Sequence, residues 1–161
     1  MKNYDRRTFL KNSIITGLGG TMAWSFPSIL KGSPNETINF AVAGVRSRGR
    51  ALSQAINKIS NARITHFCDV DDHIIAEHKK FHEMEIGYVP EAVKDFRKLI
   101  ELKDIDVIAI ATPEHWHAPM AIMAMETGKH VYVEKPCSHN PHETELLVKA
   151  QKKYGRLCQM G

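Results

Sequence analysis

The segment INFAVAGVRSRG, residues 38–49, restricts the fold of this chain more than any other stretch of its sequence. An apolar run ends at Gly44, and a helical pattern begins at Gly49. This order predicts a strand, a sharp turn at a residue without a Cβ atom, and then a helix. The N–H groups in the first turn of such a helix have no partner within the helix, and they attract an anion.

The glycine spacing in this turn is an incomplete match to the dinucleotide-binding pattern G-x-G-x-x-G. Gly44 and Gly49 stand at the first and third positions, and Arg46 replaces the middle glycine. A side chain at the middle position keeps the backbone further from a pyrophosphate, although a guanidinium can contact phosphate directly. Turns of this kind are common in α/β proteins, so the nucleotide-binding hypothesis depends on the rest of the chain.

Strand-like and helical segments alternate along the rest of the chain. In the first predicted helix, Leu52, Ala55, Ile56 and Ile59 form an apolar stripe suited to packing on a sheet. The alternation predicts an α/β fold with a doubly wound parallel sheet. The predicted strands are 38–43, 62–70, 105–111, 130–133 and 157–160; the predicted helices are 50–60, 73–82, 96–103 capped by Asp95, 120–127 and 141–154, with a loop at 83–90.

The distribution of charge argues against a nucleic-acid partner. The chain has 161 residues, 43% of them hydrophobic, which is enough for one core and one globular domain. Its formal net charge is +4, but the whole excess lies before residue 32. Because the remainder is neutral and has no basic patch rich in aromatic residues, no nucleic-acid binding is predicted.

The first 31 residues have the features of an export signal. Arg6 and Arg7 are followed by Phe9 and Leu10 and by a mildly apolar, glycine-containing run. This pattern resembles a twin-arginine signal and predicts transport by that machinery to the periplasm or beyond. A membrane-anchoring helix or an amphipathic tail is the alternative, and an uncleaved tether stays open because no clear cleavage site follows. The predicted organisation is a signal at 1–31, a linker at 32–36 and a domain at 37–161.

Four polar segments follow predicted strands and are expected to meet in one crevice, because ligands of doubly wound sheets bind beyond the carboxyl ends of the strands. The segments are 44–49, Asp69, 112–117 and 134–136. Asp69 comes 20 residues after Gly49, where a carboxylate meets the ribose hydroxyls of a bound adenosine. Asp69 is also a candidate helix cap, but Asp71 or Asp72 can cap equally well.

Lys135 is the candidate for catalysis. Pro136 fixes the backbone where the strand ends, which directs the Lys135 ammonium into the predicted crevice. A lysine there can polarise a substrate hydroxyl or carbonyl beside a nicotinamide. The alternative is a solvated lysine at a strand end, against which the TP-x-x-x-H segment one strand earlier argues.

Several of these segments together resemble the glucose-fructose oxidoreductase, inositol dehydrogenase and MocA (Gfo/Idh/MocA) family. They are residues 44–49, CDVD at 68–71, ATPEHWHAPMAI at 111–122 and GKHVYVEKP at 128–136. The resemblance covers about residues 37–161 and implies an NAD(P)-binding Rossmann domain with Lys135 as its catalytic lysine. The predicted cofactor-binding residues are Gly44, Val45, Arg46, Ser47, Arg48, Gly49, Asp69, Thr112, Pro113, Glu114, His115, Trp116, His117, Glu134 and Lys135.

The resemblance also implies a function for the whole protein. Family members continue into a C-terminal substrate domain, so we expect this chain to be truncated before that domain, which could also mediate homo-oligomers. The leading hypothesis is an exported oxidoreductase that transfers hydride between a sugar or cyclitol and NAD. Asp69 favours NAD, while Arg46, Arg48 and Arg50 leave NADP open. The alternatives are an NAD-dependent glycosidase of the same family, which tends to lack the lysine of the EKP motif, and a truncated nucleotide-binding domain without activity.

Neither the histidines nor the cysteines predict a metal site. The loops around Glu114, His115, His117, His139 and His142 contain no H-x-x-x-H or C-x-x-C spacing. The three cysteines are odd in number, and no disulfide is predicted. We expect two of them, Cys68 and Cys158, to behave as small buried hydrophobic residues.

Overall fold

The computed structural model describes residues 37–161, so the predicted signal and linker lie outside the described residues. A six-stranded sheet forms its centre, with the order β3-β2-β1-β4-β5-β6 and all neighbours parallel. This is the strand order of a doubly wound dinucleotide-binding fold, and it confirms the predicted fold class. The strands are β1 (Ile38–Ala43), β2 (Ala62–Cys68), β3 (Glu91–Val93), β4 (Val107–Ile110), β5 (His130–Val133) and β6 (Cys158–Met160).

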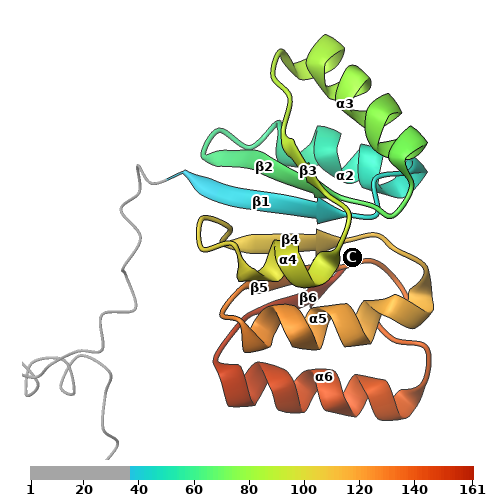
Figure 1. Cartoon of the computed structure of the whole chain (residues 1–161). Helices are drawn as coiled ribbons and strands as arrows, with labels where there is room; N and C mark the ends of the chain where they lie inside the picture. Colours follow the sequence, from blue (N-terminus) through green and yellow to red (C-terminus); the bar gives the residue numbers. More distant parts are fainter. Residues whose placement is uncertain (1–36) are drawn as a thin grey trace, which may run out of the picture. The chain divides into compact units, whose positions relative to one another are not determined.

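Helices cover both faces of the sheet, and each face has its own apolar core (Figure 1). On one face, α2 and α3 pack over β1, β2 and β4 around the fully buried Phe67 and Ile64. On the other face, α4, α5 and α6 pack around Ile108, Ile110 and Val133. The helices are α2 (Ser47–Ile56), α3 (Asp72–Ile86), α4 (Phe96–Glu101), α5 (His117–Glu126) and α6 (Pro141–Tyr154), with a short 3₁₀ turn, η1 (Glu114–Trp116).

Several predicted boundaries are wrong, and local chemistry explains the largest errors. The predicted loop at 83–90 is partly helix, since α3 continues to Ile86 and ends only where Gly87 takes a left-handed conformation with φ 88°. The first helix runs from Ser47 to Ile56 instead of 50–60, so Ile59 lies beyond it and is 49% exposed. No predicted strand corresponds to β3, which has three residues and, within residues 37–161, pairs with β2 alone. A strand this short shows no alternation to detect.

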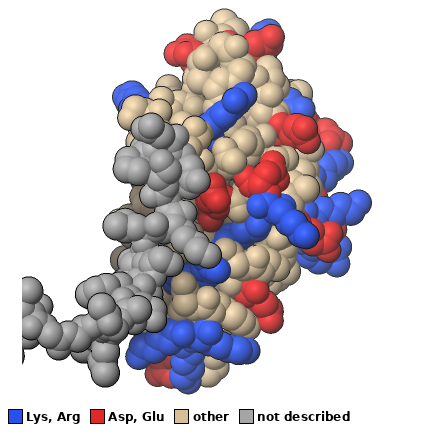
Figure 2. All heavy atoms as spheres, turned by 90° about the vertical axis from the view of Figure 1, so that its left-hand side faces the viewer, with Lys and Arg blue, Asp and Glu red and all other residues tan. Residues whose placement is uncertain are grey.

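The described residues carry interspersed charges. Figure 2 shows acidic and basic side chains side by side on the part of the surface near the amino ends of the strands. None of the helices in residues 37–161 is long and apolar enough to cross a membrane.

The three cysteines are free thiols in different surroundings. Cys68 is buried as predicted, and its burial raises the pKa of the thiol to about 12. Cys158 is only half-buried, so its prediction as a buried residue is wrong in degree. It lies in β6, an edge strand whose neighbour on one side is β5.

A buried histidine joins α2 to α3 behind the glycine turn. His78 is 1% exposed and its Nε2 lies 3.1 Å from the hydroxyl of Ser53, which in turn donates to the carbonyl of Gly49. The Nδ1 atom of His78 is buried without a hydrogen-bond partner. Burial, helped by the neighbouring His82 and Arg50, lowers the pKa of His78 from 6.5 to about 4.

We therefore expect the domain to lose stability in mild acid. Between pH 6.5 and 4 the unfolded chain binds a proton at His78 that the folded chain does not, which lowers the free energy of unfolding. The contribution of neutral His78 to stability is therefore complete above pH 6.5 and is lost as the pH falls towards 4. The expected loss is about 3 kcal/mol, or roughly 10 °C of melting temperature. Thermal unfolding from pH 7 to 4 should show a smaller decline for His78→Gln than for the natural protein. His73→Gln, at an exposed position of the same helix, should decline as the natural protein does; equal slopes for all three would contradict the assignment to His78.

Candidate dinucleotide-binding site

The four predicted segments lie at the carboxyl ends of neighbouring strands. In Figure 1 these ends are on the right-hand side of the sheet, where β1, β2, β4 and β5 release the chain into loops. Direct contacts connect all four loops. The prediction that they converge is therefore correct, while the role of each side chain in binding a cofactor stays a prediction.

The turn after β1 has no room for side chains at its first and last glycines. Gly44 has φ 80°, and a Cβ atom on it would lie 2.6 Å from the carbonyl oxygen of Ala111, at the end of β4. A Cβ atom on Gly49 would overlap the carbonyl oxygen of Gly44. The backbone of this turn thus packs directly against itself and against the neighbouring strand end. Both glycine positions of the incomplete motif are explained by these close approaches.

Helix α2 begins at Ser47, within the predicted glycine segment, so Gly49 lies in its first turn. Its N-cap residue, Arg46, has extended backbone and no side-chain hydrogen bond to the first turn. The first turn contains no acidic residue either. The amide groups at this end of a ten-residue helix therefore have no capping side chain, and the helix dipole favours an anion there.

Asp69 contacts the glycine turn from the end of β2. Its Oδ2 accepts the Val45 N–H at 3.0 Å, and its Oδ1 accepts the Asp71 N–H at 3.2 Å. Asp71, and not Asp69, caps α3, accepting the N–H groups of His73 and Ile74. The capping interaction that competed with a cofactor role for Asp69 is thus made by Asp71, one of the two residues predicted to cap.

An ion pair connects α2 to the end of β5. Nε of Arg48 lies 2.6 Å from Oε1 of Glu134, whose side chain is only 5% exposed. The hydrogen bond and charge of Glu134 raise the pKa of the Arg48 guanidinium, so Arg48 remains charged. Arg48 itself is 57% exposed and carries further N–H donors on the open side.

His117 joins the loop after β4 to the loop after β5. Its Nε2 lies 2.8 Å from the carbonyl oxygen of Thr112, and its Nδ1 lies 2.6 Å from the carbonyl oxygen of Pro136. The side chain is buried, with 2% exposed. Both ring nitrogens thus face backbone oxygens, so the imidazole ring links the two loops to each other.

The other predicted site residues are exposed along the same edge. Trp116 is 52% exposed, and the carboxylate of Glu114 lies 3.8 Å from the ring of His139. Lys135 is exposed, and its peptide bond to Pro136 is cis. Outside the glycine turn, the exposed members of the predicted set are Pro113, Glu114, His115, Trp116 and Lys135.

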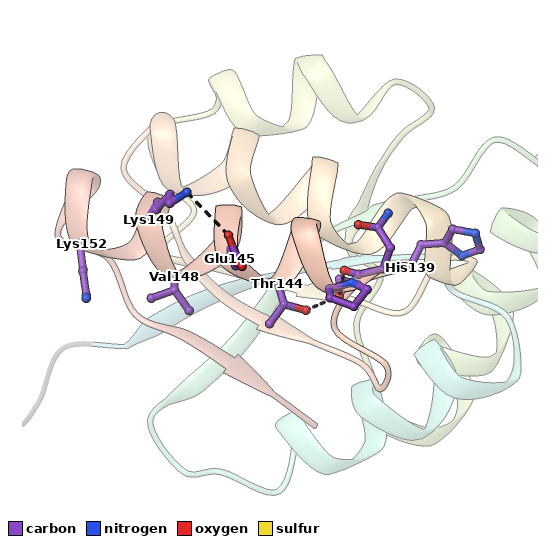
Figure 3. Close-up of a pocket in the computed structure, with 9 residues that line it drawn as sticks. His139, Thr144, Glu145, Val148, Lys149 and Lys152 are labelled. Atoms are coloured by element: carbon purple, nitrogen blue, oxygen red, sulfur yellow. Dashed lines mark hydrogen bonds and ion pairs between the residues drawn. The ribbon is translucent and has the colours of Figure 1, made fainter.

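Two hollows lie near these loops. One, of about 350 Å³, lies beside the glycine turn and is lined by Val45, Arg46, Ser47, Arg50, Ile74 and Glu77, from α2 and α3. The other, of about 850 Å³, follows the outer face of α6 past Thr144, Val148 and Lys152 (Figure 3). None of the predicted site residues lines this second hollow. Only the smaller hollow adjoins the predicted cofactor site.

These features fit a dinucleotide. A turn without side chains at its two close approaches, an uncapped helix start and a carboxylate at the end of β2 are the three groups that a pyrophosphate and its ribose require. No cluster of three metal-ligating side chains occurs among residues 37–161.

Comparison with known proteins identifies the family. A model of the oxidoreductase family with an NAD-binding Rossmann fold (GFO_IDH_MocA) matches residues 38–161. The chain belongs to the Gfo/Idh/MocA oxidoreductase family. The predicted resemblance is thereby confirmed, and the described domain is the NAD-binding domain of this family.

Relatives of this Gfo/Idh/MocA chain include both glycosidases and dehydrogenases by name. It is 30% identical over 180 residues to a glycosyl hydrolase family 109 protein 2 of Shewanella sp. (strain ANA-3), spanning 99% of this chain and 40% of that relative. It is 27% identical, with a TM-score of 0.69, to scyllo-inositol dehydrogenase from Lactobacillus casei with bound NAD(H) and scyllo-inositol, covering 78% of this chain and 36% of that one. It is 25% identical, with a TM-score of 0.68, to myo-inositol 2-dehydrogenase from Lactobacillus plantarum, covering 78% of this chain and 36% of that one.

Proposed function

We propose that the full-length protein is an NAD-dependent oxidoreductase that moves a hydride between a carbinol carbon of a sugar or cyclitol and the nicotinamide. The observation that carries this proposal is the exposed Lys135, whose flanking residues contact the glycine turn and the loop after β4. The ligand in the scyllo-inositol dehydrogenase structure, a cyclitol, supports the substrate class. The chain spans 40% of the length of its glycosidase-named relative, so the activity belongs to the proposal.

The residues of this chain would divide the work between binding and proton transfer. NAD, when bound, supplies the carbon that accepts or returns the hydride. The first turn of α2 would bind the pyrophosphate, and the Asp69 carboxylate would bind ribose hydroxyls. The neutral amine form of Lys135 would take the proton from the substrate hydroxyl as the carbinol is oxidised, and the resulting ammonium would return it in the reverse direction.

The experiment is to incubate the purified full-length protein and NAD with a panel of sugars and cyclitols, following NADH by absorbance. Net NADH with at least one of them is expected. The same samples, supplied with chromogenic glycosides, test the second candidate function. Glycoside cleavage without net NADH would replace the oxidoreductase by the glycosidase. The absence of both reactions would favour a nucleotide-binding domain without activity.

The glycosidase candidate has one specific observation in its favour, because curated relatives carry the name glycosyl hydrolase family 109. A glycosidase of this kind oxidises and re-reduces the same sugar, so it uses NAD without net turnover. Glu134, Lys135 and Pro136 argue for the oxidoreductase, since the EKP lysine is the feature that the glycosidase branch tends to lack.

We also propose export by the twin-arginine route, from the Arg6-Arg7 pattern that lies outside the described residues. The alignment to the Shewanella relative covers 99% of this chain and so includes most of this segment. A compartment without free NAD would require the enzyme to keep and regenerate its dinucleotide. Denaturing the exported protein should then release about one nicotinamide dinucleotide per chain, measured by an assay of the supernatant. Substoichiometric cofactor, with activity that depends on added NAD, would contradict this closed cycle.

A further inference from the structure

Glu134, the residue before Lys135, is held by helix α2. The Glu134 side chain is 5% exposed, and a buried carboxylate needs an ionic partner. Arg48 provides that partner through the 2.6 Å contact of its Nε with Oε1. The second carboxylate oxygen, Oε2, accepts the Lys135 N–H at 3.3 Å. The same carboxylate therefore contacts both Arg48 and the backbone of the lysine.

The residue after Lys135 is held by the loop that follows β4. The carbonyl oxygen of Pro136 lies 2.6 Å from Nδ1 of His117, and the opposite ring nitrogen is fixed on the carbonyl of Thr112. His117 is buried and begins α5, so its backbone is part of a rigid element. Its imidazole is too deeply enclosed to serve as a surface contact.

We propose that Arg48 and His117 are positioning residues for Lys135, which fix the residues on either side of it and set the place of its ammonium group. The proposal rests on the proposed function, because it assigns a purpose to the position of Lys135. Arg48 belongs to the phosphate-binding end of the site and His117 to the loop after β4. The clamp formed by these two residues therefore ties the lysine to two of the segments predicted to bind the cofactor.

The clamp addresses a definite physical problem. Lys135 is exposed, so its side chain keeps its own rotamer freedom, and any backbone movement at the strand end would add to the displacement of the ammonium group. Displacement of a catalytic group by about 1 Å can cost on the order of 10²-fold in rate. Holding Glu134 and Pro136 removes backbone movement from the lysine while leaving its ammonium free to meet substrate.

The test uses the full-length protein with two substitutions at each position. His117→Phe keeps a ring but removes both ring nitrogens, and His117→Asn keeps one amide donor. Arg48→Met removes the charge, and Arg48→Lys restores it. Arg97→Met is the matched control, because Arg97 also makes a 2.6 Å ion pair, with Asp95 at the start of α4, on the surface and outside the four loops.

Three measurements separate positioning from cofactor binding and from general stability. They are kcat and KM with the best substrate of the panel, the Kd for NAD by titration calorimetry, and amide hydrogen exchange in peptides covering 134–138 and, for comparison, α6. Exchange reports on the clamp without any turnover. It also shows whether a variant has lost its fold, because α6 would then exchange faster too.

The expected result is a fall in kcat of about tenfold or more for His117→Phe and Arg48→Met, with partial recovery in His117→Asn and Arg48→Lys. For the His117 variants the Kd for NAD should change less than about threefold, since the ring is buried. Exchange at 134–138 should become faster while α6 stays as it was. Arg97→Met should match the natural protein in all three measurements.

Natural kcat and natural exchange at 134–138 in the His117 and Arg48 variants would overturn the clamp. A fall in kcat that merely follows a weaker Kd, with unchanged exchange, would also overturn it and assign both residues to cofactor binding. If the unsubstituted protein oxidises no member of the panel, the proposed function fails separately, and the exchange comparison alone decides whether Arg48 and His117 hold the segment.

Discussion

Replacing Lys135 by methionine in the full-length protein is expected to lower turnover by about 10²-fold or more, the scale of a lost proton-transfer group. Methionine keeps much of the length of the side chain but cannot exchange a proton. Because Lys135 is exposed and its carbon stem contributes nothing to either apolar core, the fold should persist. The Kd for NAD should change little, so the loss should appear in kcat.

The matched control is Lys152→Met, on the exposed face of α6 beside the larger hollow. It makes the same chemical change outside the predicted site, and turnover should stay at the natural level. Near-normal turnover in Lys135→Met would remove the lysine from the mechanism. A large loss in Lys152→Met would instead point to the hollow along α6 as part of the site.

Replacing Asp69 by alanine should weaken NAD binding and reduce the preference for NAD over NADP. The carboxylate is expected to bind ribose hydroxyls and to repel a 2′-phosphate, so its removal costs NAD affinity and relieves NADP of a repulsion. Asp69 also accepts the Val45 N–H, so part of the loss would come from a looser glycine turn. We expect a loss of roughly tenfold in NAD affinity, equal to about 1.4 kcal/mol.

The ratio of the two affinities separates these effects, because a looser turn weakens both dinucleotides alike. Asp72→Ala is the control: that carboxylate is 77% exposed and pairs with Lys94 on the surface. Calorimetric titration should find the natural ratio in the control and a lower NAD preference in Asp69→Ala. An unchanged ratio in Asp69→Ala would refute the ribose-binding assignment.

The sheet was predictable because its strands differ in kind from the helices between them. The β4 segment, VIAI, is an unbroken apolar run, and α6 has the predicted bounds 141–154, with Asn140 capping its start and Gly155 in a left-handed conformation at its end. The short β3 was not predictable, since its three residues become a strand only by pairing with β2. Its existence depends on a neighbour distant in sequence.

The site was predictable as a set of segments but not as a set of contacts. Parallel strands bring their carboxyl ends to one edge, so the meeting of the four loops follows from topology. The Arg48–Glu134 pair joins residues 86 positions apart, and no local pattern indicates it. His117 was predicted as a cofactor-loop residue, yet its ring faces two backbone carbonyls, a role that depends on how Thr112 and Pro136 approach in space.

The most direct test of this account is a calorimetric titration of NAD into the full-length protein after removal of any bound dinucleotide. We expect saturable binding of one NAD per chain. Gly49→Ala should abolish or severely weaken that binding, because its Cβ would overlap the Gly44 carbonyl and push open the turn before α2. A folded natural protein that shows no saturable binding at millimolar NAD, or a Gly49→Ala variant that binds NAD as the natural protein does, would contradict the assignment of this turn as the dinucleotide site.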